Sequence, residues 1–384
     1  MLKRIFHEVA LFEGGSNAER SAINNRRLVL KTMMADSLVS RSELAQICHL
    51  RKQTLTNIIK ELIELNLIKE GGRKIEGKGQ PKKLLELNPH AVFAIGVHLD
   101  QGYIKAVSVD WQGNIRLQHQ ESLEDWSPEV AIEHIKRIVK NIIDQEKDYC
   151  KIFAGIGVST PNLLDNNLST YQGSYGWEAW VNFPLQEILE QQFQLPVCVE
   201  NDATSCAFGH LNTERFKELS HFVSVFIGHG LGGGIITNKV SMKGYWGNAG
   251  EVGQIRTYAG LPIEDTLSIR GLKKALSIKG DDIPDKAHLV KRLQQNDDIL
   301  HAWIEMAAKD LTYLTNILEN LFDPETIIIS GYLPQELTNI LIQKAHPLDN
   351  SISNHLARKF DRISLGYSQE GITAKGVALA TILM

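Results

Sequence analysis

The sequence has little cysteine and no long apolar run. Its 384 residues include four cysteines, Cys48, Cys150, Cys198 and Cys206, and no two of them have the C-x-x-C spacing of a zinc knuckle or redox site. We expect buried free thiols. No apolar stretch approaches the roughly 18 residues of a membrane span. The N-terminus reaches Glu8 before a signal peptide's apolar core could form, so we expect a cytoplasmic protein without a membrane partner.

The composition, with 43% hydrophobic, 22% charged and 7% aromatic residues, is that of a globular protein. It excludes collagen-like and low-complexity chains. At ~150 residues per domain, the length predicts two or three domains.

Charge is distributed unevenly along the chain. Residues 1–90 carry 16 Lys and Arg against 10 Asp and Glu, a net charge of +6, whereas residues 91–384 have a net charge of −10. A basic N-terminal module on an acidic body indicates that the first part meets a polyanion and the second part does something else.

The basic module has the pattern of a helix-turn-helix. A first helix is expected over 25–35. Ser40 with Glu43 three residues later forms a capping box, which predicts that the next helix starts there and ends near Cys48. After a short turn, apolar residues recur at helical spacing from Leu55 to Leu65, so the opposite face is polar.

That polar face suits DNA, because Gln and Asn pair with adenine while Lys and Arg contact guanine or phosphate. The glycine- and lysine-rich stretch 71–83, followed by a strand over 84–87, predicts a basic wing. A solvated helical hairpin with no nucleic-acid role is the alternative. The predicted DNA-binding residues are Arg51, Lys52, Gln53, Thr54, Thr56, Asn57, Lys60, Lys78 and Gln80.

From residue 91 the pattern alternates between strands and helices. Strands over 92–97, 103–109 and 115–118 form a meander, followed by a helix over 130–143 and a buried strand over 152–158. A second such series begins at His221. We therefore expect an α/β protein with domains at 1–90, 91–200 and 201–384, the last two being lobes around a cleft.

Five motifs in the body carry a family resemblance. They are 155–161 (GIGVSTP), 200–203 (ENDA), 228–235 (GHGLGGGI), 247–253 (GNAGEVG) and 322–326 (FDPET). In this order, the motifs resemble the ROK family of sugar kinases and sugar-responsive repressors, whose repressor branch has an N-terminal DNA-binding module. The resemblance implies a winged helix-turn-helix followed by a two-lobed actin/hexokinase-like (ribonuclease H-like) ATPase fold.

The resemblance assigns Asp202 as the catalytic base of a kinase, yet the phosphate loops depart from the family pattern. The first loop usually reads Asp-x-Gly-Gly-Thr-Lys, and here Tyr103 and Ile104 replace a glycine and a threonine. His229 replaces a threonine in the second loop. Bulk at these places should block the phosphate tail of ATP. We therefore expect no enzyme activity and no cofactor.

The residues at the family's sugar-binding positions match the family pattern better than the phosphate loops do. In that pattern, carboxylates and amides hold sugar hydroxyl groups with charge-assisted hydrogen bonds. Gln254 stands where the family has a histidine, and Gly173 where it often has an asparagine, which leaves the identity of the sugar open. The family's Cys-x-Cys segment is missing, so we expect no zinc. The predicted ligand-binding residues are Asn201, Asp202, Glu251, Gln254 and Glu264.

Together these features predict a DNA-binding repressor whose cleft binds a sugar or sugar derivative. A homodimer is expected, because two recognition helices about 34 Å apart would read a palindromic operator. A sugar kinase with Asp202 as base is one alternative, and a ligand-free dimerisation platform is another. Trp177 and Trp180 could stack on a sugar, but core packing is the favoured interpretation.

Overall fold

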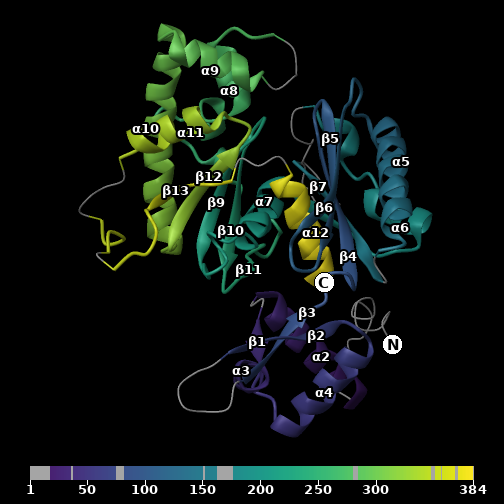
Figure 1. Ribbon diagram of the computed structural model, residues 1–384. Helices are drawn as coiled ribbons and strands as arrows, with labels where there is room; N and C mark the ends of the chain where they lie inside the picture. The colour runs from purple at the N-terminus through teal and green to yellow at the C-terminus, as the bar shows by residue number, and fades with distance from the viewer. Residues whose placement is uncertain are drawn as a thin grey trace.

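The protein consists of an N-terminal domain and two α/β lobes above it (Figure 1). The computed structural model describes residues 18–35, 38–74, 82–149, 152–161, 176–279, 284–346, 351–355, 357–367 and 371–383. In those parts of the chain, no helix is long and apolar enough to cross a membrane.

In the described residues, the N-terminal domain has helices α2, α3 and α4 and a small antiparallel sheet in the order β1-β3-β2. The predicted capping box is confirmed, since Ser40 accepts a hydrogen bond from the Glu43 backbone and Glu43 accepts one from the Ser40 backbone. The wing tip, with Lys78 and Gln80, lies outside the described residues. The elements are α2 (Ala18–Ala35), β1 (Val39–Ser40), α3 (Arg41–Ile47), α4 (Lys52–Glu64), β2 (Ile68–Lys74) and β3 (Lys82–Leu87).

The first lobe contains a five-stranded sheet in the order β6-β5-β4-β7-β8. The strands β4, β5 and β6 form an antiparallel meander, as predicted, and β7 and β8 add parallel strands beside β4. Its elements are β4 (Val92–Asp100), β5 (Tyr103–Asp110), β6 (Ile115–Ser122), α5 (Pro128–Glu146), β7 (Ile152–Thr160), α6 (Leu185–Phe193) and β8 (Val197–Asn201).

The second lobe repeats this topology with the order β11-β10-β9-β12-β13. Again a meander is extended by two parallel strands, so the two lobes are similar halves that face each other across the cleft. Its elements are α7 (Asp202–Leu211), β9 (Phe222–Ile227), β10 (Leu231–Thr237), β11 (Val240–Ser241), α8 (Ile269–Ala275), α9 (Lys286–Gln294), α10 (Asp298–Phe322), β12 (Thr326–Gly331), α11 (Gln335–Lys344), β13 (Ile363–Leu365) and α12 (Ile372–Leu383).

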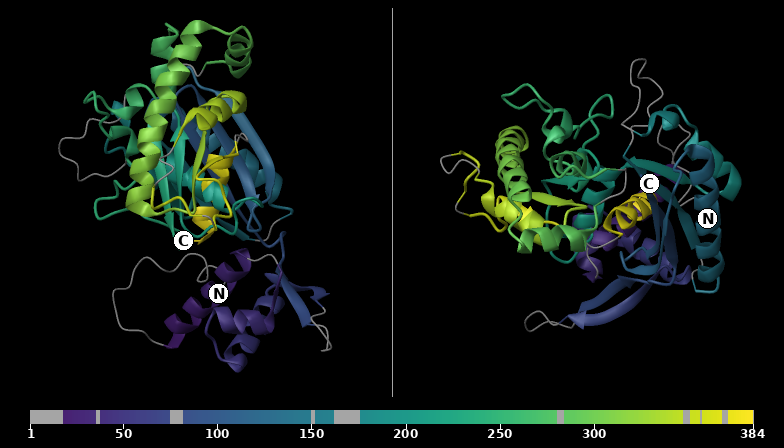
Figure 2. Two further views of the ribbon diagram at one scale, coloured as in Figure 1. Left: turned by 90° about the vertical axis from the view of Figure 1, so that its left-hand side faces the viewer. Right: turned by 90° about the horizontal axis from the view of Figure 1, so that it is seen from above.

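The helices α7 and α12 pack against each other between the two sheets (Figures 1 and 2). Glycine makes this possible: a Cβ on Gly376 of α12 would lie 1.7 Å from the carbonyl oxygen of Ser205 on α7. Although α12 ends the range 201–384 that we assigned to the second lobe, it also packs on strands β4, β5, β7 and β8 of the first lobe. The final helix therefore holds the two lobes together.

One hydrophobic cluster joins the N-terminal domain to the first lobe. It includes Leu44 and Ile59 of the N-terminal domain, Trp111 of the first lobe, and Leu379 and Ile382 of α12. In Figure 1 the chain end after α12 lies next to the N-terminal domain. The two parts are therefore packed on each other and are not separated by a free linker.

Candidate functional site

Parallel strands of both sheets end at the cleft, which is where α/β proteins place their ligand-binding residues. Asp100 ends β4, Asn201 ends β8 and Tyr332 follows β12. The side-chain carbonyl of Asn201 caps α7 by accepting hydrogen bonds from the backbone N–H groups of Ala203 and Thr204 at 2.9 and 3.2 Å. That oxygen is therefore committed to the helix, so any hydrogen bond from the Asn201 side chain to a ligand would come from its NH2 group.

Asp202, the first residue of α7, is 7% exposed. Burial raises the pKa of its carboxyl well above the ordinary value, and the nearby carboxylates of Asp100 and Glu251 raise it further. The backbone N–H of Ala203 donates to Oδ1 of Asp202 at 2.7 Å and partly opposes this effect. The folded protein therefore holds Asp202 in an environment that disfavours its charge.

Glu251, Gln254 and Glu264 lie on two short 3-10 turns of the second lobe, at or beside Val252–Gln254 and Ile263–Asp265. Nε2 of Gln254 donates to Oε1 of Glu264 at 2.8 Å, and the Arg270 guanidinium is 3.4 Å from the same oxygen. Partial burial and the Glu264 carboxylate raise the pKa of Glu251. The residue is nevertheless exposed to solvent, so its side chain is accessible to a ligand.

The structure thus gathers the sequence-predicted sugar residues at one place. Asp202 interacts electrostatically with Glu251, Glu251 interacts with Glu264, and Glu264 holds Gln254. Asn201 adjoins Asp202 along the chain. Sugar binding by this acidic cluster stays a prediction.

A hydrogen-bond hub at Tyr332, which the sequence analysis missed, crosses the cleft. The Tyr332 hydroxyl, from the second lobe, donates to Oδ2 of Asp100 in the first lobe. It also accepts from the Tyr103 hydroxyl at 2.8 Å and lies 2.9 Å from Nε2 of His98. The available signal was position, since Tyr332 is a polar residue just after a buried strand that ends at the cleft.

His98 links the hub to strand β7. Its Nε2 lies 2.9 Å from the Tyr332 hydroxyl and its Nδ1 lies 2.8 Å from the Ser159 hydroxyl. A neutral imidazole donates through one ring nitrogen and accepts through the other, so it can contact both hydroxyl groups at once. Burial lowers the pKa of His98 to about 4, which agrees with a neutral imidazole near pH 7.

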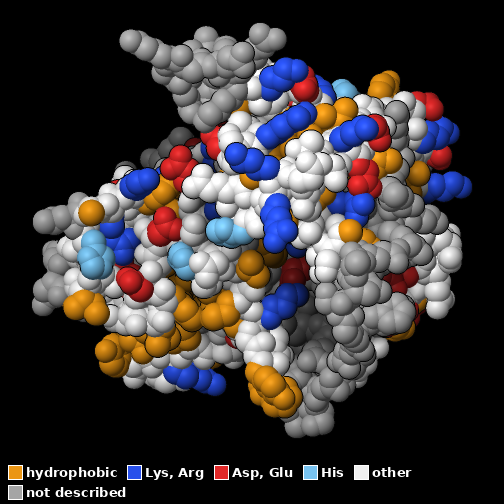
Figure 3. All heavy atoms as spheres, turned by 90° about the horizontal axis from the view of Figure 1, so that it is seen from below, with side chains coloured by type: hydrophobic (Ala, Val, Ile, Leu, Met, Phe, Trp, Pro, Cys, Tyr) orange, Lys and Arg blue, Asp and Glu red, His pale blue; other side chains and the backbone are white. Residues whose placement is uncertain are grey.

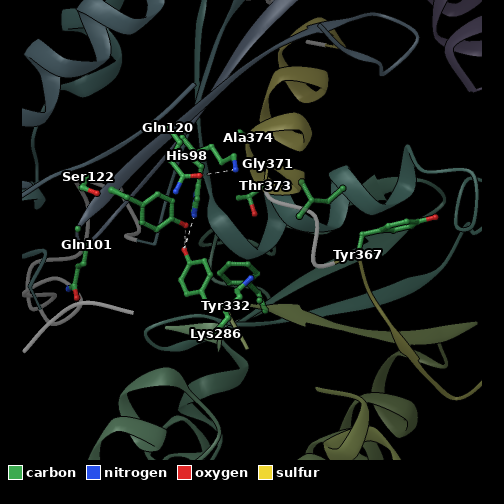
Figure 4. Close-up of a pocket in the computed structure, with 16 residues that line it drawn as sticks. His98, Gln101, Gln120, Ser122, Lys286, Tyr332, Tyr367, Gly371, Thr373 and Ala374 are labelled. Carbon is green, nitrogen blue, oxygen red and sulfur yellow. Dashed lines mark hydrogen bonds between the residues drawn. The ribbon is translucent and has the colours of Figure 1, made fainter. Parts of the chain in front are cut away.

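The same tyrosine lines a cavity of about 350 Å³ between the lobes. In Figure 4, Tyr332 and His98 point toward each other from opposite sides of this cavity. Asp202, Glu251, Gln254 and Glu264 are not among the lining residues, so the cavity and the acidic cluster are neighbouring but distinct. The lining residues include His98, Gln101, Tyr103, Lys105, Gln120, Phe226, Lys286, Tyr332, Tyr367 and Thr373.

Asp100 and Tyr103, which belong to the first phosphate loop in the family resemblance, are therefore bonded to the opposite lobe. A nucleotide phosphate approaching Asp100 would have to displace the Tyr332 hydroxyl and the Tyr103 side chain. In the second loop, Nε2 of His229 is buried and has no hydrogen-bond partner among the described residues. In the first loop, Asp100 and Tyr103 are thus already engaged by a residue of the second lobe.

Replacing Tyr332 by phenylalanine should destabilise the protein by about 1–3 kcal/mol, because Asp100, His98 and Tyr103 each lose a hydrogen-bond partner. Urea unfolding of the purified protein measures this change. Tyr367→Phe is the control, since Tyr367 lines the same cavity without a hub contact. Equal effects of the two substitutions would contradict the hub.

The favoured interpretations of the tryptophans and thiols agree with the structure. Trp177 and Trp180 are each 1% exposed and pack together in the first-lobe core. Cys48, Cys198 and Cys206 are buried free thiols, and burial raises the pKa of Cys198 to about 12 and of Cys206 to about 11. These thiols are poor nucleophiles. Cys150 and Gly173 lie outside the described residues.

Seven of the nine predicted DNA-binding residues lie on α4 or at its N-cap, and the other two, Lys78 and Gln80, lie outside the described residues. Six of them are exposed, and Thr54 is half-buried, while Leu55, Ile58, Ile59 and Leu62 form the buried face. In the view from below, where the N-terminal domain is nearest, Lys and Arg side chains gather across the upper half of the surface (Figure 3). The exposed residues are Arg51, Lys52, Gln53, Thr56, Asn57 and Lys60.

No group of three His, Cys, Asp or Glu side chains in the described ranges is arranged to hold a metal ion. The expected lack of structural zinc stays a prediction. Cys198 and Cys206 are each buried thiols whose raised pKa disfavours the thiolate that zinc requires.

Comparisons with known proteins find relatives that match the chain over most of its length. A profile of the ROK family matches residues 94–364. The chain is 27% identical over 382 residues to a xylose repressor of Bacillus spizizenii, covering 94% of each protein. It is 28% identical over 269 residues to a glucokinase of Streptomyces coelicolor, covering 63% of this chain and 82% of the glucokinase.

A solved structure also resembles the protein over most of its length. The crystal structure of a ROK family transcriptional regulator, a homolog of the E. coli MLC protein, superposes with a TM-score of 0.70 at 19% identity. It covers 94% of this chain and 96% of that one. This likeness shows the fold. It extends over the N-terminal domain as well as the two lobes, whereas the glucokinase match covers 63% of the chain.

Proposed function

The chain belongs to the ROK family, and from this premise we propose that it is a transcriptional repressor whose DNA binding responds to a sugar in the interlobe cleft. The observation that carries the proposal is the Tyr332 hub. It ties Asp100 and Tyr103 of the first phosphate loop to the opposite lobe, while the acidic cluster beside it stays open to a polyhydroxylated ligand. A kinase needs both the phosphate loop and the acidic cluster to be accessible, whereas a sugar-responsive regulator needs only the acidic cluster.

DNA contact is assigned to α4 and the basic wing. The helix presents amide side chains at Gln53 and Asn57 and cationic side chains at Arg51, Lys52 and Lys60. Amides read adenine edges in the major groove, and the cations contact guanine or phosphate. A homodimer would place two such helices on the half-sites of a palindrome. A cytoplasmic location is part of this proposal, because a repressor must reach its operator DNA.

Communication between cleft and DNA runs through the shared hydrophobic cluster. Closure of the lobes around a sugar moves the first lobe relative to the second lobe, on either side of the packed helices α7 and α12. Because Trp111 and Leu379 pack in the same cluster as the N-terminal domain, that domain moves with them. In a dimer this changes the spacing of the two α4 helices and therefore the affinity for DNA, by a coupling of about 1–3 kcal/mol.

The experiment that tests the proposal is a gel shift of full-length protein with DNA upstream of its own gene at a stated salt concentration. D-xylose, which the name of the Bacillus relative suggests, is the first sugar to add. D-glucose and N-acetylated hexosamines follow. Specific binding that one sugar changes is the expected result. Absence of specific binding even at low salt would contradict the proposal.

Arg51 offers a test of the DNA interface that separates stability from function. It is the N-cap residue of α4 and, among the described residues, makes no side-chain cap hydrogen bond. Serine at this position should cap the helix and raise stability by about 1 kcal/mol. The same change removes a cation, so operator affinity should fall and lose part of its salt dependence.

Urea unfolding and gel shifts at several salt concentrations measure these two effects. Arg116→Ser is not a suitable control, because Arg116 pairs with buried Glu146. Lys147→Ser is better matched, since Lys147 is an exposed cation at the end of α5 in the first lobe. An Arg51→Ser protein with unchanged DNA affinity would argue against this face of α4.

A further inference from the structure

The loop that leads into Glu251 carries two exposed aromatic residues. Tyr245 is 90% exposed and Trp246 is 67% exposed, and their rings meet edge to face with centroids 4.7 Å apart. Exposing two large aromatic side chains side by side is unfavourable in water, so such a pair indicates a binding surface.

Hydrogen bonds and an ion pair fix this loop beside the acidic cluster. The backbone N–H of Ala249 donates to the carbonyl of Lys243 at 3.1 Å and closes the loop at its base. Nζ of Lys243 lies 2.8 Å from Oε2 of Glu200, the residue immediately before Asn201 and Asp202. The loop is therefore tied at one end to Asn201 and Asp202, and at the other it continues into Glu251.

Glycine shapes the tip of the loop. Gly244 and Gly247, on either side of the aromatic pair, have φ values of 72° and 79°, which residues with a Cβ rarely adopt. Glu251 is five positions after Trp246 in the chain, so their Cα atoms are at most about 18 Å apart. A di- or trisaccharide can span that distance.

The charge of the neighbouring site restricts what the loop can bind. Asp202, Glu251 and Glu264 bring three carboxyl groups into the acidic cluster, and the Arg270 guanidinium pairs with Glu264 at 3.4 Å. This excess of acidic groups disfavours phosphorylated or otherwise anionic ligands. Neutral sugar rings fit both the acidic cluster and the aromatic pair. Their hydroxyl groups donate to the carboxylates, and their apolar C–H faces pack on aromatic rings.

We propose that Tyr245 and Trp246 form an aromatic platform for a second sugar ring, so that the effector is a neutral di- or oligosaccharide. The first ring occupies the acidic cluster and the second stacks on the platform. This inference rests on the proposed sugar-responsive function and adds the size class of the ligand.

Titration calorimetry on the full-length protein tests the platform with D-xylose, xylobiose and xylotriose, and with D-glucose, cellobiose and maltose. We expect one disaccharide to bind about tenfold more tightly than its monosaccharide. Trp246→Ala should remove that gain and leave monosaccharide affinity unchanged. Tyr258→Ala is the control, since Tyr258 is a 96% exposed tyrosine in the next loop.

The outcomes distinguish this inference from the function on which it rests. Equal affinities for monosaccharide and disaccharide, or a Trp246→Ala protein that keeps the gain, would overturn the platform and leave the sugar-responsive function standing. If no saccharide binds the wild-type protein, both fail. If Trp246→Ala changes only the oligomeric state in light scattering, the aromatic pair is a protein contact and the platform is wrong.

Discussion

Replacing Asp202 by asparagine is expected to weaken sugar binding by about 10- to 150-fold, because a charge-assisted hydrogen bond contributes about 1.5–3 kcal/mol. DNA binding without sugar should be unchanged, since Asp202 lies at the cleft and α4 lies in the N-terminal domain. Calorimetry with the sugar found in the gel shift measures the first effect, and a gel shift measures the second. Glu305→Gln, a change of an exposed carboxylate on α10, is the control.

The pH dependence of sugar binding follows from the same residue. Its pKa is raised in the free protein, and sugar hydroxyl groups that donate to the carboxylate favour the ionised form. Binding therefore releases a proton, and affinity for sugar should increase as the pH rises through the raised pKa of Asp202. The Asp202→Asn protein should lack this dependence. A sugar affinity that falls with rising pH would contradict the assignment.

The Asp202→Asn substitution should increase the stability of the folded protein, although it weakens sugar binding. A carboxyl whose pKa is higher in the folded than in the unfolded protein costs stability once the pH exceeds the unfolded value, ordinarily near 3.8. Asparagine removes that cost, and its side-chain oxygen can still accept from the Ala203 N–H. Asp202→Asn should therefore raise Tm by about 2–4 °C at pH 7–8. At pH 4 the gain should vanish.

An assay of ATP turnover by the wild-type and Asp202→Asn proteins distinguishes a repressor from a kinase. We expect no sugar-dependent ATP turnover in the wild-type protein, because Tyr103 and Tyr332 occupy the approach to Asp100. Turnover that is present in the wild type and disappears in Asp202→Asn would establish Asp202 as a catalytic base. That result would overturn the non-enzymatic part of the proposal.

Truncating Trp111 to alanine should destabilise the protein by about 3–5 kcal/mol, the usual cost of removing a buried tryptophan. Trp111 is 1% exposed and packs in the cluster shared by the N-terminal domain and the first lobe. Its indole N–H donates to the carbonyl of Asn88 at 2.8 Å, in the segment that links the domains. Thermal unfolding of the full chain measures the loss.

A milder variant keeps the coupling testable if Trp111→Ala fails to fold. Trp111→Phe retains an apolar ring but removes the hydrogen bond to Asn88, and sugar and operator should each still bind. The factor by which sugar changes operator affinity should shrink toward one. Trp180→Phe, at a buried tryptophan remote from the N-terminal domain in the first-lobe core, is the control. An unchanged factor in Trp111→Phe would contradict transmission through this cluster.

Much of the fold could be predicted from the sequence because its signals are local. The capping box at Ser40 and Glu43 gave the start of α3, and the apolar spacing in α4 gave its buried face. The buried strand predicted over 152–158 corresponds to β7 (Ile152–Thr160), which begins at the predicted residue. By contrast, α2 begins at Ala18, earlier than the predicted 25, since its first turns have no apolar periodicity to mark them.

The candidate site was predicted in part. Asn201, Asp202, Glu251, Gln254 and Glu264 stand in motifs, so each could be assigned from its neighbours in the chain. Their mutual contacts could not, because they lie on separate elements that only the packed lobes bring together.

The sequence by itself determined the chemistry available to this protein: a basic helix-turn-helix, acidic sugar motifs, and bulky residues in the phosphate loops. Only the tertiary structure decided how these parts act on one another. Tyr332 reaches Asp100 from 232 positions away along the chain, and α12 returns to pack beside a domain at the opposite end of the sequence. Local patterns specify which elements form, but contacts across such separations depend on how whole sheets pack, which no single segment encodes.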